Sequence, residues 1–134
     1  MILGIDHIGL VTSDPTGLAP YLDILGMSKV DTGVAAEYRV ACEFWQGAGE
    51  PLIELVSPAA EGSVLDAHLA RRGPGLHHIA VRVDDVGAEL DRLRQNGFTP
   101  VDRRPCAGAR EGMLVAFTYL PRPGGLLVEL VQYG

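Results

Sequence analysis

Two histidines and two glutamates stand at matching positions of a sequence that repeats itself. His78 follows His7 by 71 positions, and each opens an apolar stretch that ends in acidic residues. Glu129 follows Glu54 by 75 positions, at the centre of two nearly identical apolar pentapeptides. Imidazole nitrogens and carboxylate oxygens are common ligands of divalent metal ions. The four side chains therefore predict a metal site shared by two copies of one structural unit.

The alternation of residues around the histidines predicts which face of each strand carries them. Side chains at every second position of a strand share a face, so His7 lies with Gly9, and His78 lies with Ala80. These small neighbours leave room in front of the imidazoles. A lone histidine on a strand is usually structural. Recurrence of a histidine and a glutamate in both units instead favours one divalent ion, namely Co²⁺, Zn²⁺, Mn²⁺, Ni²⁺ or Fe²⁺.

The elements that must carry these residues follow in the order strand, helix, strand, strand, strand. Alternating apolar residues indicate strands, whereas apolar residues three or four apart, closed by Gly26, indicate a helix. The first unit comprises a strand at 5–11, a helix over 18–25, strands at 28–32 and 37–44, a hairpin turn over Gly47–Glu50 and a strand at 51–56.

The second unit repeats this order after a connection that contains a short helix. Its helix ends at Gly97, which follows Gly26 by the same 71 positions that separate the histidines. The predicted elements are a strand at 76–83, a helix that begins at Val86 and ends at Asn96–Gly97, a short strand near Val101, a loop at 105–112, and strands at 113–120 and 126–132.

The repeat predicts an α+β fold in which two tandem βαβββ modules form one domain, residues 1–134. Module 1 covers about 4–57, a connection covers 58–74 and module 2 covers 75–134. We expect one incompletely closed, eight-stranded mixed sheet around a metal cleft, with His7 and His78 facing each other. In the alternative arrangement, two chains of a dimer exchange their units.

Composition excludes several classes of function. Of the 134 residues, 47% are hydrophobic and 21% are charged, which is ordinary for a globular domain. The formal net charge of −6 argues against sequence-independent binding of nucleic acid. No apolar run approaches the roughly 18 residues of a membrane helix, and the N-terminus lacks a secretory pattern. We expect a soluble, cytoplasmic protein without a membrane or nucleic-acid partner.

Some polar residues have no counterpart in the other unit. His68 and His77 are predicted to be structural, and alternation places His77 on the helix side of its strand. Arginines are dense at Arg71–Arg72 and Arg103–Arg104. These arginines are either solvated charges or contacts for the anionic tail of a substrate. Cys42 is predicted to be a core residue, and no disulfide framework is expected.

The residue pattern resembles that of the vicinal oxygen chelate superfamily, the glyoxalase and dioxygenase group of paired βαβββ modules. Within this superfamily, the chain is most similar to the methylmalonyl-CoA epimerase family. The resemblance runs nearly end to end and is carried by Asp6–Leu10, Ile53–Pro58, Gly75–Val81, Val83–Asp85, Gly108–Ala109, Val115–Phe117 and Gly124–Leu130.

The resemblance implies a role for each candidate residue. The metal ligands of the family fall on His7, His78 and Glu129, and a fourth position, Gln or Glu in the family, falls on Glu54. A further acidic residue of the family falls on Glu37, which has no counterpart in the second unit. Glu37 and Glu129 are therefore the candidate catalytic residues.

The implied reaction is abstraction of the proton next to a thioester carbonyl, through an enolate that the metal stabilises. Epimerisation needs proton donors and acceptors on both faces of the planar intermediate, which would be the task of Glu37 and Glu129. The expected partners are a small-molecule substrate, an acyl-CoA or a related carboxylate, and a second copy of the chain in a homodimer.

The sequence departs from the family at Thr118–Pro121, where the family has Leu-His-Pro, and at the bulky segment Glu43–Gln46. Both departures leave the acyl group, and the thioester itself, open. The alternatives are another metal-dependent activity of the superfamily, such as glyoxalase-type isomerisation, Fe(II)-dependent ring cleavage or a biosynthetic tailoring reaction. A non-catalytic small-molecule binding protein is the remaining alternative, and it is disfavoured by the four retained polar positions.

Overall fold

The computed structural model describes residues 1–49 and 51–134. In this part of the chain, nine strands form one mixed sheet in the order β2-β3-β4-β1-β5-β9-β8-β6, with β7 paired to β8. The strands are β1 (Ile2–Val11), β2 (Ser28–Ala35), β3 (Val40–Gln46), β4 (Leu52–Pro58), β5 (Gly75–Val83), β6 (Thr99–Pro100), β7 (Cys106–Ala107), β8 (Met113–Leu120) and β9 (Leu126–Tyr133). The helices are α1 (Pro15–Ile24), α2 (Asp66–Arg72) and α3 (Val86–Arg94).

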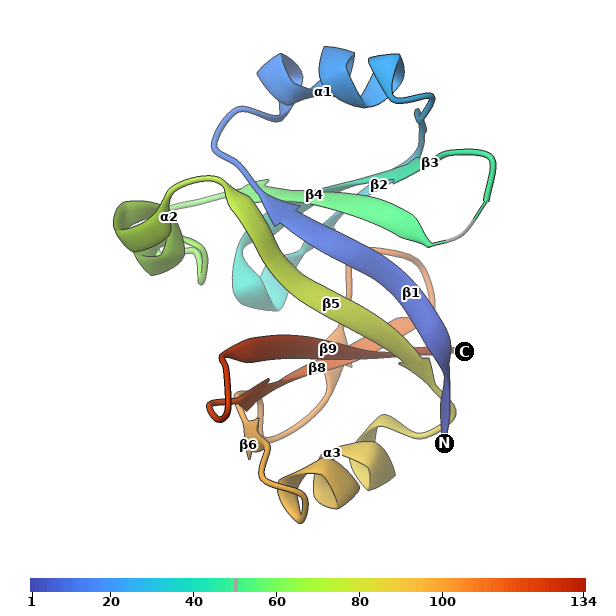
Figure 1. Ribbon diagram of the computed structural model, residues 1–134, viewed down its shortest axis with the longest axis vertical. Coiled ribbons are helices and arrows are strands. Elements are labelled where there is room, and N and C mark those ends of the chain that lie inside the picture. Colours follow the sequence, from blue (N-terminus) through green and yellow to red (C-terminus); the bar gives the residue numbers. More distant parts are fainter. Residues whose placement is uncertain (50) are drawn as a thin grey trace.

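The two predicted βαβββ modules are present, and they meet in the middle of the sheet. β1 pairs with β5 in antiparallel orientation, and β4 and β9 flank this pair in parallel orientation (Figure 1). In this structure the two modules of one chain pair with each other. The α+β fold class is confirmed, but the sheet of the described residues has nine strands rather than eight. The additional strand, β7, is only two residues long, too short for a periodic signal.

Each module covers the outer face of its half-sheet with one helix, α1 at one end of the molecule and α3 at the other (Figure 1). Both helices begin at an aspartate whose side chain accepts a hydrogen bond from the first turn. Asp14 accepts from Gly17 N at 2.9 Å, and Asp85 accepts from Ala88 N at 3.0 Å. The repeat therefore includes the signals that start the helices.

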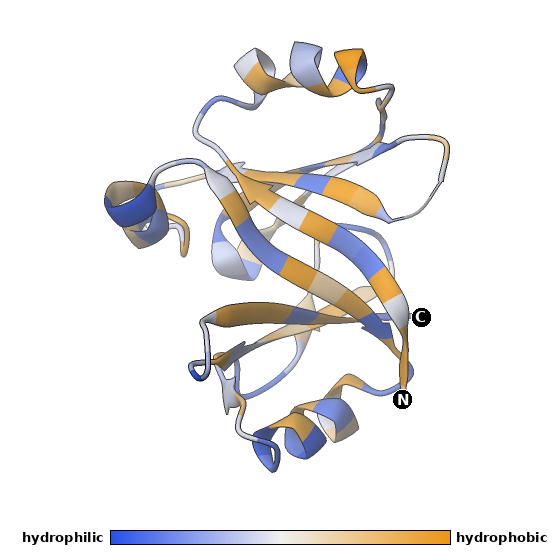
Figure 2. Ribbon diagram, viewed as in Figure 1, coloured by the Kyte–Doolittle hydropathy of each residue, from blue (hydrophilic) through white to orange (hydrophobic). Residues whose placement is uncertain are grey.

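Period-two alternation divides the strand residues between the helix faces and the inner face, and it shows as bands along β1 and β5 (Figure 2). Leu22 of α1 packs on Leu55 and Trp45, and in the second module α3 packs on Ala116, Val128 and Leu130. Two further apolar clusters line the inner face. One contains Val11, Phe44 and Val56, and the other contains Ala80, Val115 and Val131.

The segment before β3 differs from the prediction. Glu37 lies in a 3₁₀ helix, Ala36–Tyr38, and not on a strand that begins at Glu37. Arg39 follows with a left-handed φ of 56°, and its N–H donates to Ala36 O at 3.1 Å. This tight turn interrupts the alternation, so β3 begins only at Val40. The predicted hairpin turn over Gly47–Glu50 includes residue 50, which lies outside the described residues.

Within the described residues, no helix combines the length and the apolar composition that crossing a bilayer requires.

Candidate metal centre

The first and last strands of each module bring the four predicted ligands together. His7 lies on β1 opposite Ala80 of β5, and His78 lies on β5 opposite Gly9 of β1. The closing strands place Glu54 beside Gly9, and Glu129 beside Ala80. Because all four side chains point to the inner face, a two-fold repeat of one module produces a single cluster.

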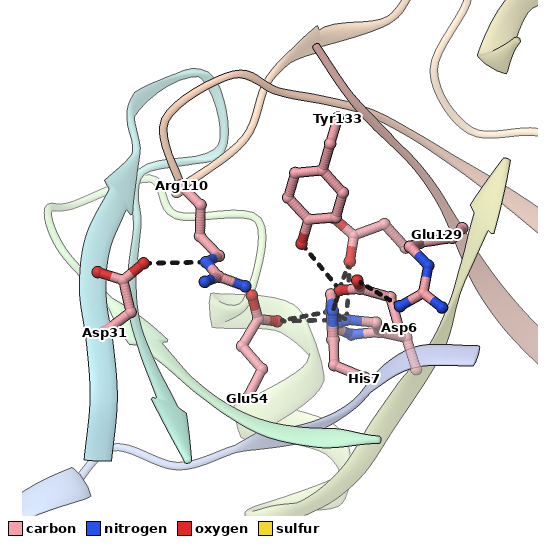
Figure 3. A network of polar contacts seen from close by, with 9 residues as sticks. Asp6, His7, Asp31, Glu54, Arg110, Glu129 and Tyr133 are labelled. Carbon is pink, nitrogen blue, oxygen red and sulfur yellow. Dashed lines mark hydrogen bonds and ion pairs between the residues drawn. The ribbon is translucent and has the colours of Figure 1, made fainter. Parts of the chain in front are cut away.

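The four side chains are close enough to bind one ion. His7 Nε2 lies 3.1 Å from His78 Nε2. Glu129 Oε1 lies 2.9 Å from His7 Nε2 and 3.1 Å from His78 Nε2, and Glu54 Oε1 lies 3.3 Å from both nitrogens. In Figure 3, the two glutamates approach His7 from different sides. Ligands about 2.1 Å from a common ion and at right angles to each other would be about 3.0 Å apart.

Burial and an unpartnered oxygen support this fit. The exposed fractions are 0% for His7, 4% for Glu54, 6% for His78 and 5% for Glu129. Glu129 Oε1 is buried and accepts no hydrogen bond from the described residues, although both Nε2 atoms are within ion-pair distance. A buried carboxylate oxygen without a donor is costly, and a cation would satisfy it. The four residues therefore fit a divalent metal.

The Nδ1 atom of His7, which does not face the other three ligands, contacts a buried carboxylate. His7 Nδ1 lies 2.7 Å from Asp6 Oδ2, and Tyr133 donates its hydroxyl proton to the same oxygen at 3.1 Å. Figure 3 shows Asp6 and Tyr133 beside His7. A carboxylate on Nδ1 orients an imidazole so that Nε2 is directed at an ion. The sequence pattern did not predict this contact of Asp6, although Asp6 directly precedes His7 in the chain.

His77 contacts Nδ1 of His78, as Asp6 contacts Nδ1 of His7. The prediction that His77 lies on the helix side of its strand is therefore wrong. His77 Nδ1 lies 2.8 Å from His78 Nδ1. The reason is a bulge in β5. Gly9 pairs with His78 and Leu10 pairs with Leu76, so His77 is the extra residue and strict alternation fails. His77 follows Asp6 by 71 positions, so the two partners occupy equivalent places in the modules.

The carboxylates control the protonation of the cluster. Burial alone would lower the pKa of both histidines. At His7, Asp6 and the two glutamates outweigh burial and raise the pKa to about 12. At His78, Glu129 and Glu54 raise the pKa to about 9. Burial would raise the pKa of Glu54, but the two imidazoles hold it below its usual range. An ion must therefore displace imidazole protons when it binds.

Aromatic rings enclose the cluster and leave little free space. Phe44 meets His7 edge-to-face at 5.9 Å between ring centroids, and Phe117 meets His78 in the same way at 5.3 Å. The cavity in front of the cluster holds about 40 Å³ and is otherwise lined by apolar side chains such as Val40 and Val115. Low polarity and little water strengthen the electrostatic effect of any ion held there.

A loop of the second module closes one side of the cleft. Arg110, between β7 and β8, donates to Asp31 of β2 at 2.9 Å (Figure 3). Its guanidinium group also lies over the Phe44 ring, 5.2 Å from the ring centroid. Next to it, Gly33 lies so close to the carbonyl of Ala109 that a Cβ would not fit there. These contacts join residues far apart in the sequence, and no local pattern indicated them.

Glu37 lies outside the cluster. Its side chain is exposed and lines a separate cavity of about 380 Å³. This outer cavity shares Tyr38, His77 and Phe117 with the cavity in front of the cluster. The structure thus brings four of the five candidate residues into direct contact and places the fifth, Glu37, at the approach to them.

Residues 6–117 match the Glyoxalase/Bleomycin resistance protein/Dioxygenase superfamily. The chain belongs to this superfamily, as its residue pattern predicted.

Similar proteins within the superfamily include methylmalonyl-CoA epimerases. The human mitochondrial methylmalonyl-CoA epimerase is 28% identical over 130 residues, which cover 96% of this chain and 73% of the human protein. The Mycobacterium tuberculosis epimerase structure aligns with a TM-score of 0.87 and 30% identity, over 99% of this chain and 89% of that one. A Streptomyces coelicolor epimerase variant in complex with 2-nitronate-propionyl-CoA aligns with a TM-score of 0.86 and 28% identity, over 100% and 99% of the chains.

Proposed function

We propose that this protein is a metal-dependent epimerase that inverts the carbon next to the thioester carbonyl of an acyl-CoA, as methylmalonyl-CoA epimerases do. The observation that carries the proposal is the buried set of two histidines and two glutamates, with one glutamate oxygen lacking a hydrogen-bond donor. The similarity to methylmalonyl-CoA epimerases, one of them bound to an acyl-CoA analogue, supports this substrate class.

His7, Glu54, His78 and Glu129 would hold the ion in this proposal. A bound divalent ion supplies Lewis-acid stabilisation of negative charge on the thioester oxygen when the neighbouring C–H bond breaks. Asp6 and His77 keep the two imidazoles oriented, through the Nδ1 contacts of 2.7 Å and 2.8 Å. The small cavity in front of the cluster would hold little water beside the reacting carbon.

Glu37 and Glu129 would transfer the protons. One carboxylate removes the proton from one face of the reacting carbon, and the other side chain delivers a proton to the opposite face, which inverts the centre. Glu129 is suited to one face because its oxygen lies in the cluster, and Glu37 is suited to the other because its cavity adjoins that of the cluster. Each group then returns to its starting protonation state through solvent.

Incubation of the metal-loaded protein with one enantiomer of methylmalonyl-CoA in D₂O tests the proposal. We expect solvent deuterium at C2 and the appearance of the other enantiomer, and neither after treatment with a chelator. Absence of both exchange and inversion with methylmalonyl-CoA and with ethylmalonyl-CoA would contradict an acyl-CoA epimerase. Turnover of the glutathione adduct of methylglyoxal would then indicate glyoxalase-type isomerisation.

We also propose that two copies of the chain form a homodimer. Ile2, Leu3 and Ile5 of β1 are exposed by 45%, 53% and 49%, although strand residues of this size are usually buried. A second copy that covers them would remove this apolar surface from water. Light scattering coupled to size-exclusion chromatography should give twice the mass of one chain, and Ile2→Lys with Ile5→Lys should give the monomer mass. A monomeric parent protein would contradict the proposal.

A further inference from the structure

The space at the cluster is too small for most of an acyl-CoA. A cavity of about 40 Å³ is comparable with the volume of one or two water molecules, so the pantetheine arm and the nucleotide of an acyl-CoA do not fit there. The remainder of a bound acyl-CoA must lie outside, in a cavity that reaches the cluster. Two larger cavities meet this condition, and both of them include His77 in their walls.

The larger cavity, here called the arginine groove, has a volume of about 680 Å³ and begins at the cluster residue His78. Its walls come from α2, from the start of β5 and from the β8–β9 hairpin. Arg71 and Arg72, at the end of α2, supply the charge, and Leu76 and Leu126 supply apolar surface. Leu76 is 75% exposed, so its side chain is accessible to a ligand in the groove.

The two cavities differ in charge. Among the residues that the structure describes, no aspartate or glutamate lines the arginine groove, so Arg71 and Arg72 make it net positive. The smaller cavity also has two arginines, Arg103 and Arg104, but Glu37 and Asp102 lie in the same wall. Among the described residues, neither Arg71 nor Arg72 has an ion-pair partner, so both guanidinium groups are available to an anion.

We propose that the arginine groove binds the phosphate-bearing nucleotide end of coenzyme A, with Arg71 and Arg72 paired to its phosphates. This inference rests on the proposed acyl-CoA epimerase function and adds the direction in which the substrate lies. Guanidinium groups form strong, bidentate hydrogen bonds with phosphate oxygens. The exposed leucines of the groove would contact the less polar pantetheine arm, which runs from the cluster to the arginines.

The chain geometry allows one substrate to reach both ends of the groove. Arg72 precedes His78 by six positions, so their backbones are at most about 20 Å apart. The connection turns at Gly73, where φ is 71°, and this turn makes the separation shorter than the fully extended limit. The flexible pantetheine arm, which is built from short units joined by two amide bonds, spans a distance of this order.

Paired substitutions distinguish the two cavities. We expect Arg71→Ala with Arg72→Ala to weaken binding of free CoA, measured calorimetrically, at least about tenfold, because the loss of even one charged hydrogen bond to a phosphate typically costs this much. The KM for methylmalonyl-CoA should rise to a similar extent with kcat nearly unchanged. The matched control is Arg103→Ala with Arg104→Ala, which removes the same charge from the smaller cavity and should change the CoA affinity less than twofold.

A truncated substrate supplies the second comparison. With methylmalonyl-pantetheine, which lacks the nucleotide and its phosphates, the Arg71/Arg72 variant should turn over at the rate of the parent. Equal CoA affinity of this variant and the parent, or a larger loss in the Arg103/Arg104 variant, would overturn the inference while leaving epimerisation intact. A parent protein that neither binds CoA nor epimerises methylmalonyl-CoA would instead overturn the proposed function and the inference together.

Discussion

Asp6 and His77 occupy equivalent positions in the two modules, yet they hold the neighbouring imidazoles with different chemistry. Asp6 offers a carboxylate to His7, whereas His77 offers a ring nitrogen to His78. Burial, with the nearby His78 and His68, lowers the pKa of His77 to about 4, so its ring is neutral at neutral pH. A neutral ring nitrogen can accept the Nδ1 proton that His78 retains when its Nε2 faces an ion.

A first prediction concerns His77. Replacement of His77 by alanine leaves the Nδ1 proton of His78 without an acceptor, so the affinity for Co²⁺ should fall at least about tenfold, as is usual for such partners. His77→Asn places an amide oxygen near the position of the lost nitrogen and should restore much of the affinity. Titration of the visible Co²⁺ spectrum measures both effects. The control is His68→Ala, since His68 contacts the His77 ring but not His78. Parental affinity in His77→Ala would refute the positioning role.

A second prediction separates the two candidate catalytic glutamates. Glu37 lies outside the cluster, so Glu37→Gln should leave the metal affinity almost unchanged while kcat falls by about 10²-fold or more. Glu129→Gln should weaken both metal binding and turnover, because Glu129 belongs to the cluster.

Deuterium exchange refines the test of Glu37. Because the two carboxylates would serve opposite faces, we expect Glu37→Gln to exchange the C2 proton of one enantiomer without inverting it. Epimerisation by Glu37→Gln at the parental rate would show that Glu37 is an ordinary surface residue. Of the five candidate residues, Glu37 alone has an exposed side chain, and it lies on a 3₁₀ helix.

At the level of the elements, the junction of β1 and β5 determines the geometry of the cluster. Each histidine of these two central strands lies opposite a small residue of the other strand. His7 is opposite Ala80, and His78 is opposite Gly9. The imidazole of His78 occupies the space that a side chain at position 9 would need. A small residue is therefore required at this position by packing, not by backbone conformation.

A third prediction follows for Gly9. A methyl group in Gly9→Ala would overlap the His78 ring, so the ring must leave its position in the cluster. We expect the metal affinity to fall about tenfold or more, with little change in the far-ultraviolet circular dichroism spectrum. Gly124→Ala is the control, because a Cβ at Gly124 meets open space. Equal metal affinities of Gly9→Ala and the parent would mean that the position of the His78 ring does not control the site.

At the scale of the whole molecule, the cluster joins two modules that have separate apolar cores beneath α1 and α3. Each module contributes one histidine and one glutamate, so an ion bound by all four binds only the assembled sheet. Ligands that bind only the folded state stabilise it by RT ln(1 + [L]/Kd). The metal should therefore contribute to folding stability as well as to chemistry.

A fourth prediction concerns metal removal. At a free Co²⁺ concentration about 100-fold above Kd, the unfolding free energy should rise by about 2.7 kcal/mol relative to the protein in chelator. For a chain of this length, the melting temperature should then rise by roughly 10 °C. Thermal unfolding monitored by circular dichroism measures the shift. The double variant His7→Ala, His78→Ala should show no such response, and an equal response would place the ion elsewhere.

The parts of the fold that depend on local periodicity were predictable from the sequence. Hydrophobic periodicity acts over a few residues, so β8, predicted at 113–120, has these bounds, and α3, predicted to begin at Val86 and to end at Asn96–Gly97, spans Val86–Arg94. The matched histidines and glutamates predicted the cluster itself, because a repeated module brings equivalent strands together. Alternation also correctly placed Glu54 and Glu129 on the inner face.

The roles of residues without such regularity depend on irregular backbone positions and on packing between distant segments. The β5 bulge turns His77 toward His78, and the left-handed Arg39 moves Glu37 off its predicted strand. Both depend on a single irregular backbone position, which a periodic pattern cannot reveal. The contact of Arg110 with Asp31 and the volumes of the cavities depend on segments distant in sequence. Such contacts arise from packing after the modules meet, so the local sequence does not encode them.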